Sequence, residues 1–140
     1  MALCTSTKSG LAYPAAIARI ERLKQREPGW NAHRSLNVTQ ASREAAIVFL
    51  RKLWAEFGAS VPEPSVVAPT AIGGVAVEWV VKDLGEERGI EVVCLPERYE
   101  YSIRNRATGR LEDDSQNASL RSILTSVIKL HVADHSGRPS

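Results

Sequence analysis

Three glutamates form the one group of residues whose type and spacing could do chemistry. Glu78, Glu91 and Glu100 fall in three consecutive expected strands, and strand alternation places them on the same polar face. If Val80 pairs with Glu91 and Val93 with Glu100, then Glu78 and Glu100 flank Val93, and Glu91 lies diagonal to both. Three carboxylates on neighbouring strands could hold Mg²⁺, which takes oxygen ligands.

The competing interpretation of these glutamates is an ordinary solvent-exposed sheet face. The cations Lys82, Arg98 and Arg104 lie among them in the sequence. Like charges on adjacent strands are commonly relieved by such neighbours rather than by a metal. We favour the solvent-exposed face, so we expect neither a metal nor another cofactor, and the glutamate site stays as the alternative.

The residue types that most often serve as nucleophiles and metal ligands are sparse. His33, His131 and His135 do not have the HExxH or paired spacing of a zinc site. Cys94 alternates with apolar positions of its strand, so we expect a core thiol rather than the nucleophile of a Cys–His pair. Gly73-Gly74 precedes a strand and lacks the phosphate-loop pattern, which favours a hairpin turn. We therefore predict no catalytic residue.

Six residues are candidates for binding a partner, one aromatic and five basic. The aromatic residue lies in a polar Gly-Trp-Asn connector, where it is either a recognition anchor or, as we favour, a plug for the end of the core. The basic residues belong to an N-terminal helix and to a loop after the last strand. Without a recognition motif, they support only non-specific nucleic-acid binding. The candidates are Trp30, Arg19, Arg22, Arg26, Arg104 and Arg106.

The net charge is uneven along the chain. Residues 1–60 hold nine Lys and Arg against four acids, and residues 61–140 hold nine against twelve. The basic half could seek nucleic acid or an acidic partner, although solvated Arg-rich helices explain it as well. The start of the chain does not resemble a signal peptide, and no apolar run approaches the roughly 20 residues of a membrane span. We expect a cytoplasmic protein without membrane contact.

Three amphipathic helices are predicted from apolar residues spaced three and four apart. Pro14 suits the first turn of the first helix. Thr39 fits the N-cap of the second helix, and Gly58 fits its C-terminal stop. The predicted helices cover about 14–27, 40–57 and 118–132.

Two-residue alternation predicts three strands with one apolar face. A shorter fourth strand at 65–70 contains Pro69, which is typical of a sheet edge. We predict a turn at 83–88 and a mobile polar loop at 108–117. The three strands are centred on 75–81, 90–94 and 99–103.

The fold class that follows is α+β: an antiparallel three- to four-stranded meander packed with two N-terminal helices and one C-terminal helix. We predict a single domain at 13–134, with a flexible lead-in at 1–12 and a flexible tail at 135–140. The predicted core includes Val77, Trp79, Val92, Tyr101, Leu50, Leu53 and Ile123.

Four stretches resemble a widespread group of short uncharacterised bacterial proteins: PGWN at 28–31, SREAAIVFLRKL at 42–53, PSVVAPTAIGGVAVEW at 64–79 and ERYEYSI at 97–103. The group has a Gly-Trp-Asp/Asn turn, an amphipathic helix, a Pro-Thr turn and a Gly-Gly-Val-x-Val/Leu-Glu-Trp strand. This chain has Asn31 where Asp is common. The resemblance covers about 28–104 and implies no catalytic residue. The group resembles cargo of mobile or defence-type gene neighbourhoods, which implies a partner-binding role.

We therefore expect a non-catalytic bacterial protein-interaction subunit that associates with itself or with another chain, as a partner, adaptor or antitoxin-like component. Such a subunit could belong to a mobile-element or defence system. Two alternatives stay open. One is a nucleic-acid-binding accessory protein that uses the basic N-terminal helices, and the other is a small metal-dependent enzyme that uses the sheet-face glutamates.

Overall fold

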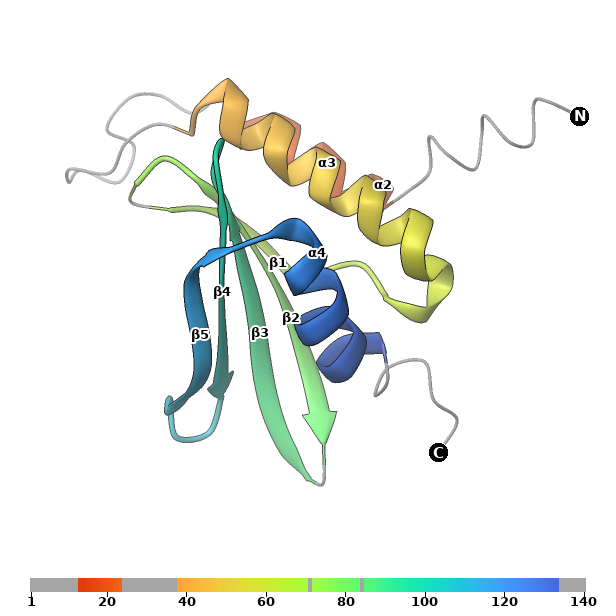
Figure 1. Cartoon of the computed structure of the whole chain (residues 1–140), viewed down its shortest axis with the longest axis vertical. Helices are drawn as coiled ribbons and strands as arrows, with labels where there is room; N and C mark the ends of the chain where they lie inside the picture. Colours follow the sequence, from red (N-terminus) through yellow and green to blue (C-terminus); the bar gives the residue numbers. More distant parts are fainter. Residues whose placement is uncertain (1–12, 24–37, 71, 84, 134–140) are drawn as a thin grey trace, which may run out of the picture.

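Five antiparallel strands form the centre of the fold, and helices pack along one side of the sheet (Figure 1). The structure is a computed structural model that describes residues 13–23, 38–70, 72–83 and 85–133. The strands follow one another across the sheet in chain order, so β1 and β5 are its two edges. They are β1 (Val66–Pro69), β2 (Val75–Asp83), β3 (Glu86–Cys94), β4 (Tyr99–Asn105) and β5 (Leu111–Ala118). The antiparallel α+β class and the edge position of β1 agree with the prediction.

Two helices precede the sheet, α2 (Pro14–Arg22) and α3 (Gln40–Phe57). Pro14 occupies the first turn of α2, as predicted, while positions 24–27 of the predicted helix lie outside the described residues. The Thr39 side chain caps α3 by accepting a hydrogen bond from the N–H of Ser42 at 3.0 Å. Gly58 ends α3 at φ 57°, in the left-handed region that favours glycine. A short 3-10 turn, η2 (Gly58–Ser60), follows.

The helix-facing side of the sheet forms one core with the helices. Phe49 of α3 packs edge-on against Trp79 of β2, with ring centroids 6.2 Å apart. The indole N–H of Trp79 donates to the carbonyl of Pro62 at 2.8 Å, so its burial leaves no donor unsatisfied. Six of the seven predicted core residues are buried, and Tyr101 is half-buried against the same cluster.

The turn predicted at 83–88 is too long, and the predicted pairing of β2 with β3 is therefore also wrong. Asp83 pairs with Glu86, so only two residues connect β2 to β3. One of them is Gly85, whose φ of 83° needs glycine's freedom. The shorter turn moves β3 by two positions, which keeps every side chain on its predicted face. Glu91 therefore lies opposite Glu78 rather than Val80.

The mobile loop predicted at 108–117 is also wrong, because most of it forms β5. The β4–β5 connection is a tight turn in which the N–H of Asn105 donates to the carbonyl of Arg110 at 2.9 Å. Gly109 supplies a positive φ of 73°. The sheet thus has five strands instead of three or four.

The C-terminal helix begins as α4 (Leu120–Ser122) and continues as the π-helix η3 (Ile123–Ala133), where a continuous α-helix at 118–132 was predicted. The fully buried residues of η3 are Ile123 and those four, five and nine positions later: Val127, Ile128 and Val132. At about 3.6 residues per turn, Val132 would point opposite to Ile123. The wider π turn keeps all four in one stripe against the sheet.

Candidate interaction surface

The sheet face away from the core carries the predicted glutamates. A polar row crosses four strands at their centre, because Glu78 pairs with Glu91, Glu91 with Ser102, and Ser102 with Asp114. None of the described helices contributes to this face, since their buried apolar residues all join the core on the other side. This row and its neighbours form a surface that the described part of the chain leaves uncovered.

Neighbouring cations and a glycine accommodate the facing carboxylates. Arg106 lies 3.7 Å from Glu78, and the carboxylate of Glu78 extends over Gly89, where a Cβ would collide with it. Burial raises the pKa of Glu91 above its ordinary value, and the Glu78 charge adds to this rise, while Arg104 and a hydrogen bond with Ser102 oppose it. The row is thus a partly compensated, electronegative patch.

The arrangement of carboxylates that the metal alternative requires does not form. Glu78 and Glu100 do not flank Val93, because the residue opposite Val93 on β2 is Ala76. Glu100 is paired instead with Arg98 at 3.0 Å. Within residues 13–23, 38–70, 72–83 and 85–133, no three His, Cys, Asp or Glu side chains are grouped closely enough to hold a metal ion.

Hydrogen bonds of β4 define which way the peptide groups of the last strands point. Arg106, just beyond β4, donates its N–H to the carbonyl of Glu87 on β3 at 2.9 Å, whereas Asn105 donates to Arg110 on the β5 side at 2.9 Å. Successive residues of an antiparallel strand bond to opposite neighbours. Odd-numbered residues of β4 therefore bond to β5.

This alternation directs the peptide groups of Asp114 toward the open edge of the sheet. Tyr101 pairs with Ser115 and Ile103 with Asp113, so these two β5 residues bond to β4 and Asp114 between them does not. Consistent with this, the N–H of Asp114 donates to the side-chain Oδ1 of Asp113 at 2.9 Å. Six of the eight β5 residues are exposed, and β5 has a neighbouring strand on one side only.

Three consecutive acids give the β5 edge its charge. Glu112 accepts from Arg88 at 2.7 Å, and Asp113 accepts from the hydroxyl of Tyr101 at 3.2 Å. Asp114 makes no ion pair with any residue that the structure describes. These acids were not predicted as a site, although Asn105 and Gly109 flank a hairpin-like turn that could have indicated a fifth strand.

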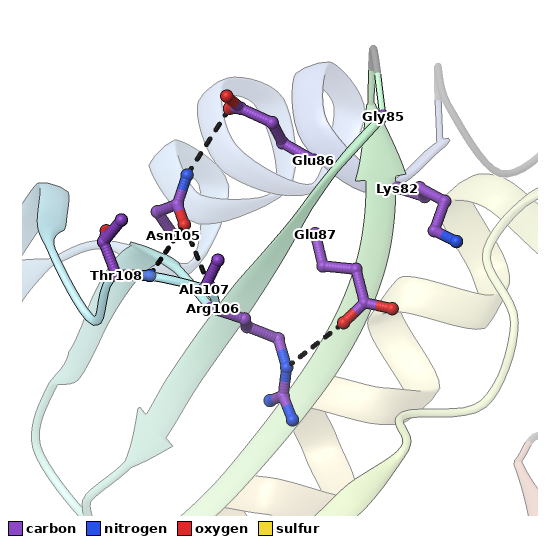
Figure 2. Close-up of a pocket in the computed structure, with 8 residues that line it drawn as sticks. All are labelled: Lys82, Gly85, Glu86, Glu87, Asn105, Arg106, Ala107 and Thr108. Atoms are coloured by element: carbon purple, nitrogen blue, oxygen red, sulfur yellow. Dashed lines mark hydrogen bonds and ion pairs between the residues drawn. The ribbon is translucent and has the colours of Figure 1, made fainter.

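A cleft of ≈ 530 Å³ lies where the β2–β3 and β4–β5 hairpins end (Figure 2). Asn105 organises one wall by accepting from the N–H groups of Ala107 at 2.9 Å and Thr108 at 3.1 Å. The Thr108 hydroxyl accepts from the N–H of Arg110, and the described residues that line the cleft include no Cys, His or Ser. The lining therefore lacks a nucleophile paired with a base. It comprises Lys82, Gly85, Glu86, Glu87, Asn105, Arg106, Ala107 and Thr108.

The predicted partner-binding residues do not form one patch. Arg19 and Arg22 are exposed on α2, whereas Arg104 bonds to the carbonyl of Gly109 beside the β4–β5 turn. Figure 1 places α2 and this turn at opposite ends of the molecule. Trp30 and Arg26 lie outside the described residues.

Cys94 is a core residue, as predicted. Its side chain is fully buried in the cluster between sheet and helices. Burial strongly raises the pKa of the thiol, so the nucleophilic thiolate is suppressed. His131 is half-buried on η3, and His33 and His135 lie outside the described residues.

Comparison with known proteins does not add an assignment. No protein-family model, curated protein or solved structure matches the chain. Among the helices that the structure describes, none has the length and apolar character needed to cross a membrane.

Proposed function

We propose that this chain is a non-catalytic protein-interaction subunit that works by docking to another polypeptide. The open edge at β5 carries the proposal. It is eight residues long and mostly exposed, and the alternation of hydrogen bonds directs the Asp114 peptide groups outward. An unpaired edge is a ready template for another chain. The uncovered polar row beside it extends the surface available to a partner.

The chemistry of the described side chains supports association over catalysis. The cleft at the hairpin ends is lined by ion pairs and turn hydrogen bonds, and the Cys94 thiol is buried in the core. The resemblance to short bacterial proteins of mobile or defence-type neighbourhoods also favours an adaptor, partner or antitoxin-like role.

The proposal is tested by purifying the tagged chain from its native host, identifying co-purifying proteins and reconstituting each pair. Light scattering over a concentration series gives the molar mass of the chain alone and with each candidate. We expect a defined complex whose interface buries about 1,000 Å² or more. A strict monomer that carries out a small-molecule reaction in purified form would contradict the proposal.

Nucleic-acid binding is a second candidate, favoured by the exposed basic residues of α2. Arg19 and Arg22 form no ion pair with a described carboxylate. If they bind phosphates, affinity for DNA or RNA should fall steeply with salt, and Arg19→Glu with Arg22→Glu should abolish it. Absence of binding at low salt would remove this candidate and leave the protein-interaction proposal unchanged.

A further inference from the structure

The two edges of the sheet differ in how much room they leave for another strand. β1 is four residues long and contains Pro69, and α2 contacts it. Glu63, just before β1, anchors α2 by accepting from the N–H groups of Ala15 at 2.8 Å and Ala16 at 3.0 Å. A short strand with proline and a helix beside it is a protected edge. β5 is twice as long, and no described element covers it.

The regular part of β5 is the segment from Asp113 to Ser115. Register irregularities of the β4–β5 ladder lie on both sides of it, so an added strand would centre its hydrogen bonds on Asp114. In the free protein, the N–H of Asp114 already donates a hydrogen bond to the carboxylate of Asp113. An incoming carbonyl has to replace that contact, and a nearby cation would compensate the released carboxylate.

The charges of β5 select which strand it accepts. A second β5 laid alongside would bring six carboxylates together, and like charges across a strand pair are destabilising. The acids thus discourage self-pairing while favouring a basic partner. Beside Asp114 on the uncovered face is a hollow of ≈ 150 Å³, whose lining includes Glu91, Glu100 and Arg104. The hollow is lined by three acids and Arg104, and Arg98 beside it already pairs with Glu100. The acids therefore still outnumber the cations, and a long basic side chain of an added strand would reach the hollow.

We propose that the β5 edge accepts an extended, basic segment of a different chain as a sixth strand, centred on Asp114, with Lys or Arg side chains on the uncovered face. This inference rests on the proposed function and specifies its surface and partner chemistry. Backbone hydrogen bonds supply the affinity in such strand addition, and alternate side chains supply the specificity.

The probe is an eight-residue peptide, the length of β5, that alternates lysine with threonine and carries a fluorescent label. Its binding to the full chain is followed by anisotropy at low and high salt. We expect saturable binding that weakens with salt. The matched control peptide alternates glutamate with threonine and should not bind. Equal binding of the two peptides, or no binding of the lysine peptide, would overturn the inference.

Two substitutions of Asp114 distinguish the contribution of its backbone N–H to peptide binding from the contribution of its charge. Asp114→Pro removes the outward N–H while leaving the β4–β5 hydrogen bonds, since proline is tolerated where an edge N–H faces solvent. It should weaken lysine-peptide binding about tenfold or more. Asp114→Asn keeps the N–H and should weaken binding roughly three- to tenfold at low salt, with a smaller difference at high salt. Glu21→Gln on the exposed side of α2 removes the same charge and should change nothing.

Failure of this inference is distinguishable from failure of the proposed function. If a reconstituted protein complex persists unchanged in Asp114→Pro, the partner docks elsewhere: strand addition is overturned and the interaction function stands. If the chain forms no complex with any protein, the proposed function fails as well. Retained lysine-peptide affinity in a folded Asp114→Pro variant, checked by circular dichroism, also overturns strand addition.

Discussion

At the scale of single residues, the facing pair Glu78 and Glu91 places two like charges opposite each other on neighbouring strands, which is unfavourable. Glu91 bonds through its backbone to β4, so its pair with Glu78 is a non-hydrogen-bonded one, in which side chains approach most closely. Gly89 gives the Glu78 carboxylate room, and Arg106 attracts it. We therefore expect this pair to lower the stability of the folded protein.

Because the pKa of Glu91 is raised, the loss of folding stability caused by its negative charge can be measured as a function of pH. The folded protein holds the Glu91 proton more tightly than the unfolded chain does, so folding stability falls as pH rises above the ordinary value of 4.5 and through the raised pKa. Glu91→Gln should therefore raise the melting temperature at neutral pH, and the gain should vanish below that ordinary value. Thermal unfolding at several pH values checks this. A gain that persists unchanged in acid would contradict the electrostatic cause.

At the scale of elements, α3 is the helix that ties the N-terminal half to the sheet. It presents Phe49, Leu50 and Leu53 to the core, all fully buried, and its two ends are fixed by Thr39 and Gly58. Tyr99 of β4 adds a hydrogen bond from its hydroxyl to the carbonyl of Ala45 at 3.4 Å. The packing of α3 on the inner face therefore helps to hold the strands that form the uncovered face.

Leu53→Ala should cost about 2–5 kcal/mol of unfolding free energy, because the side chain is fully buried and its removal leaves a cavity. Lys52→Ala, one position earlier and exposed, should stay within about 0.5 kcal/mol and serves as the matched control. Urea unfolding measures both variants. Equal effects of the two substitutions would place Leu53 outside the core.

An element can be predicted from the sequence where its burial leaves a regular spacing of apolar residues. Apolar alternation in β2 and β3 and the cap at Thr39 were predicted correctly, because each carries a local signal. β5 has only Ala118 buried, so no alternation distinguishes it from a loop, and pairing with β4 alone forms it. The Glu78–Glu91 pairing was missed because a two-residue slip conserves every face. The π winding of η3 has no local signature in the chain.

At the scale of the whole molecule, the hydrophobic core lies on one side of the sheet, and we propose that recognition uses the other face and the β5 edge. Helices and the inner sheet face share one core, while the opposite face and the β5 edge carry charge without covering elements among the described residues. The first 60 residues carry a net positive charge and the remaining 80 a net negative charge. Complementary potentials of this kind speed and orient association.

The most direct test of the central claim, that the chain acts by docking a partner at the β5 edge, is amide hydrogen exchange of the full chain with and without its co-purified protein partner. We predict new protection at the Asp114 amide and its neighbours in β5, little change in α2, and loss of that protection in Asp114→Pro. Protection confined to other elements, or none at saturating partner, would contradict the account.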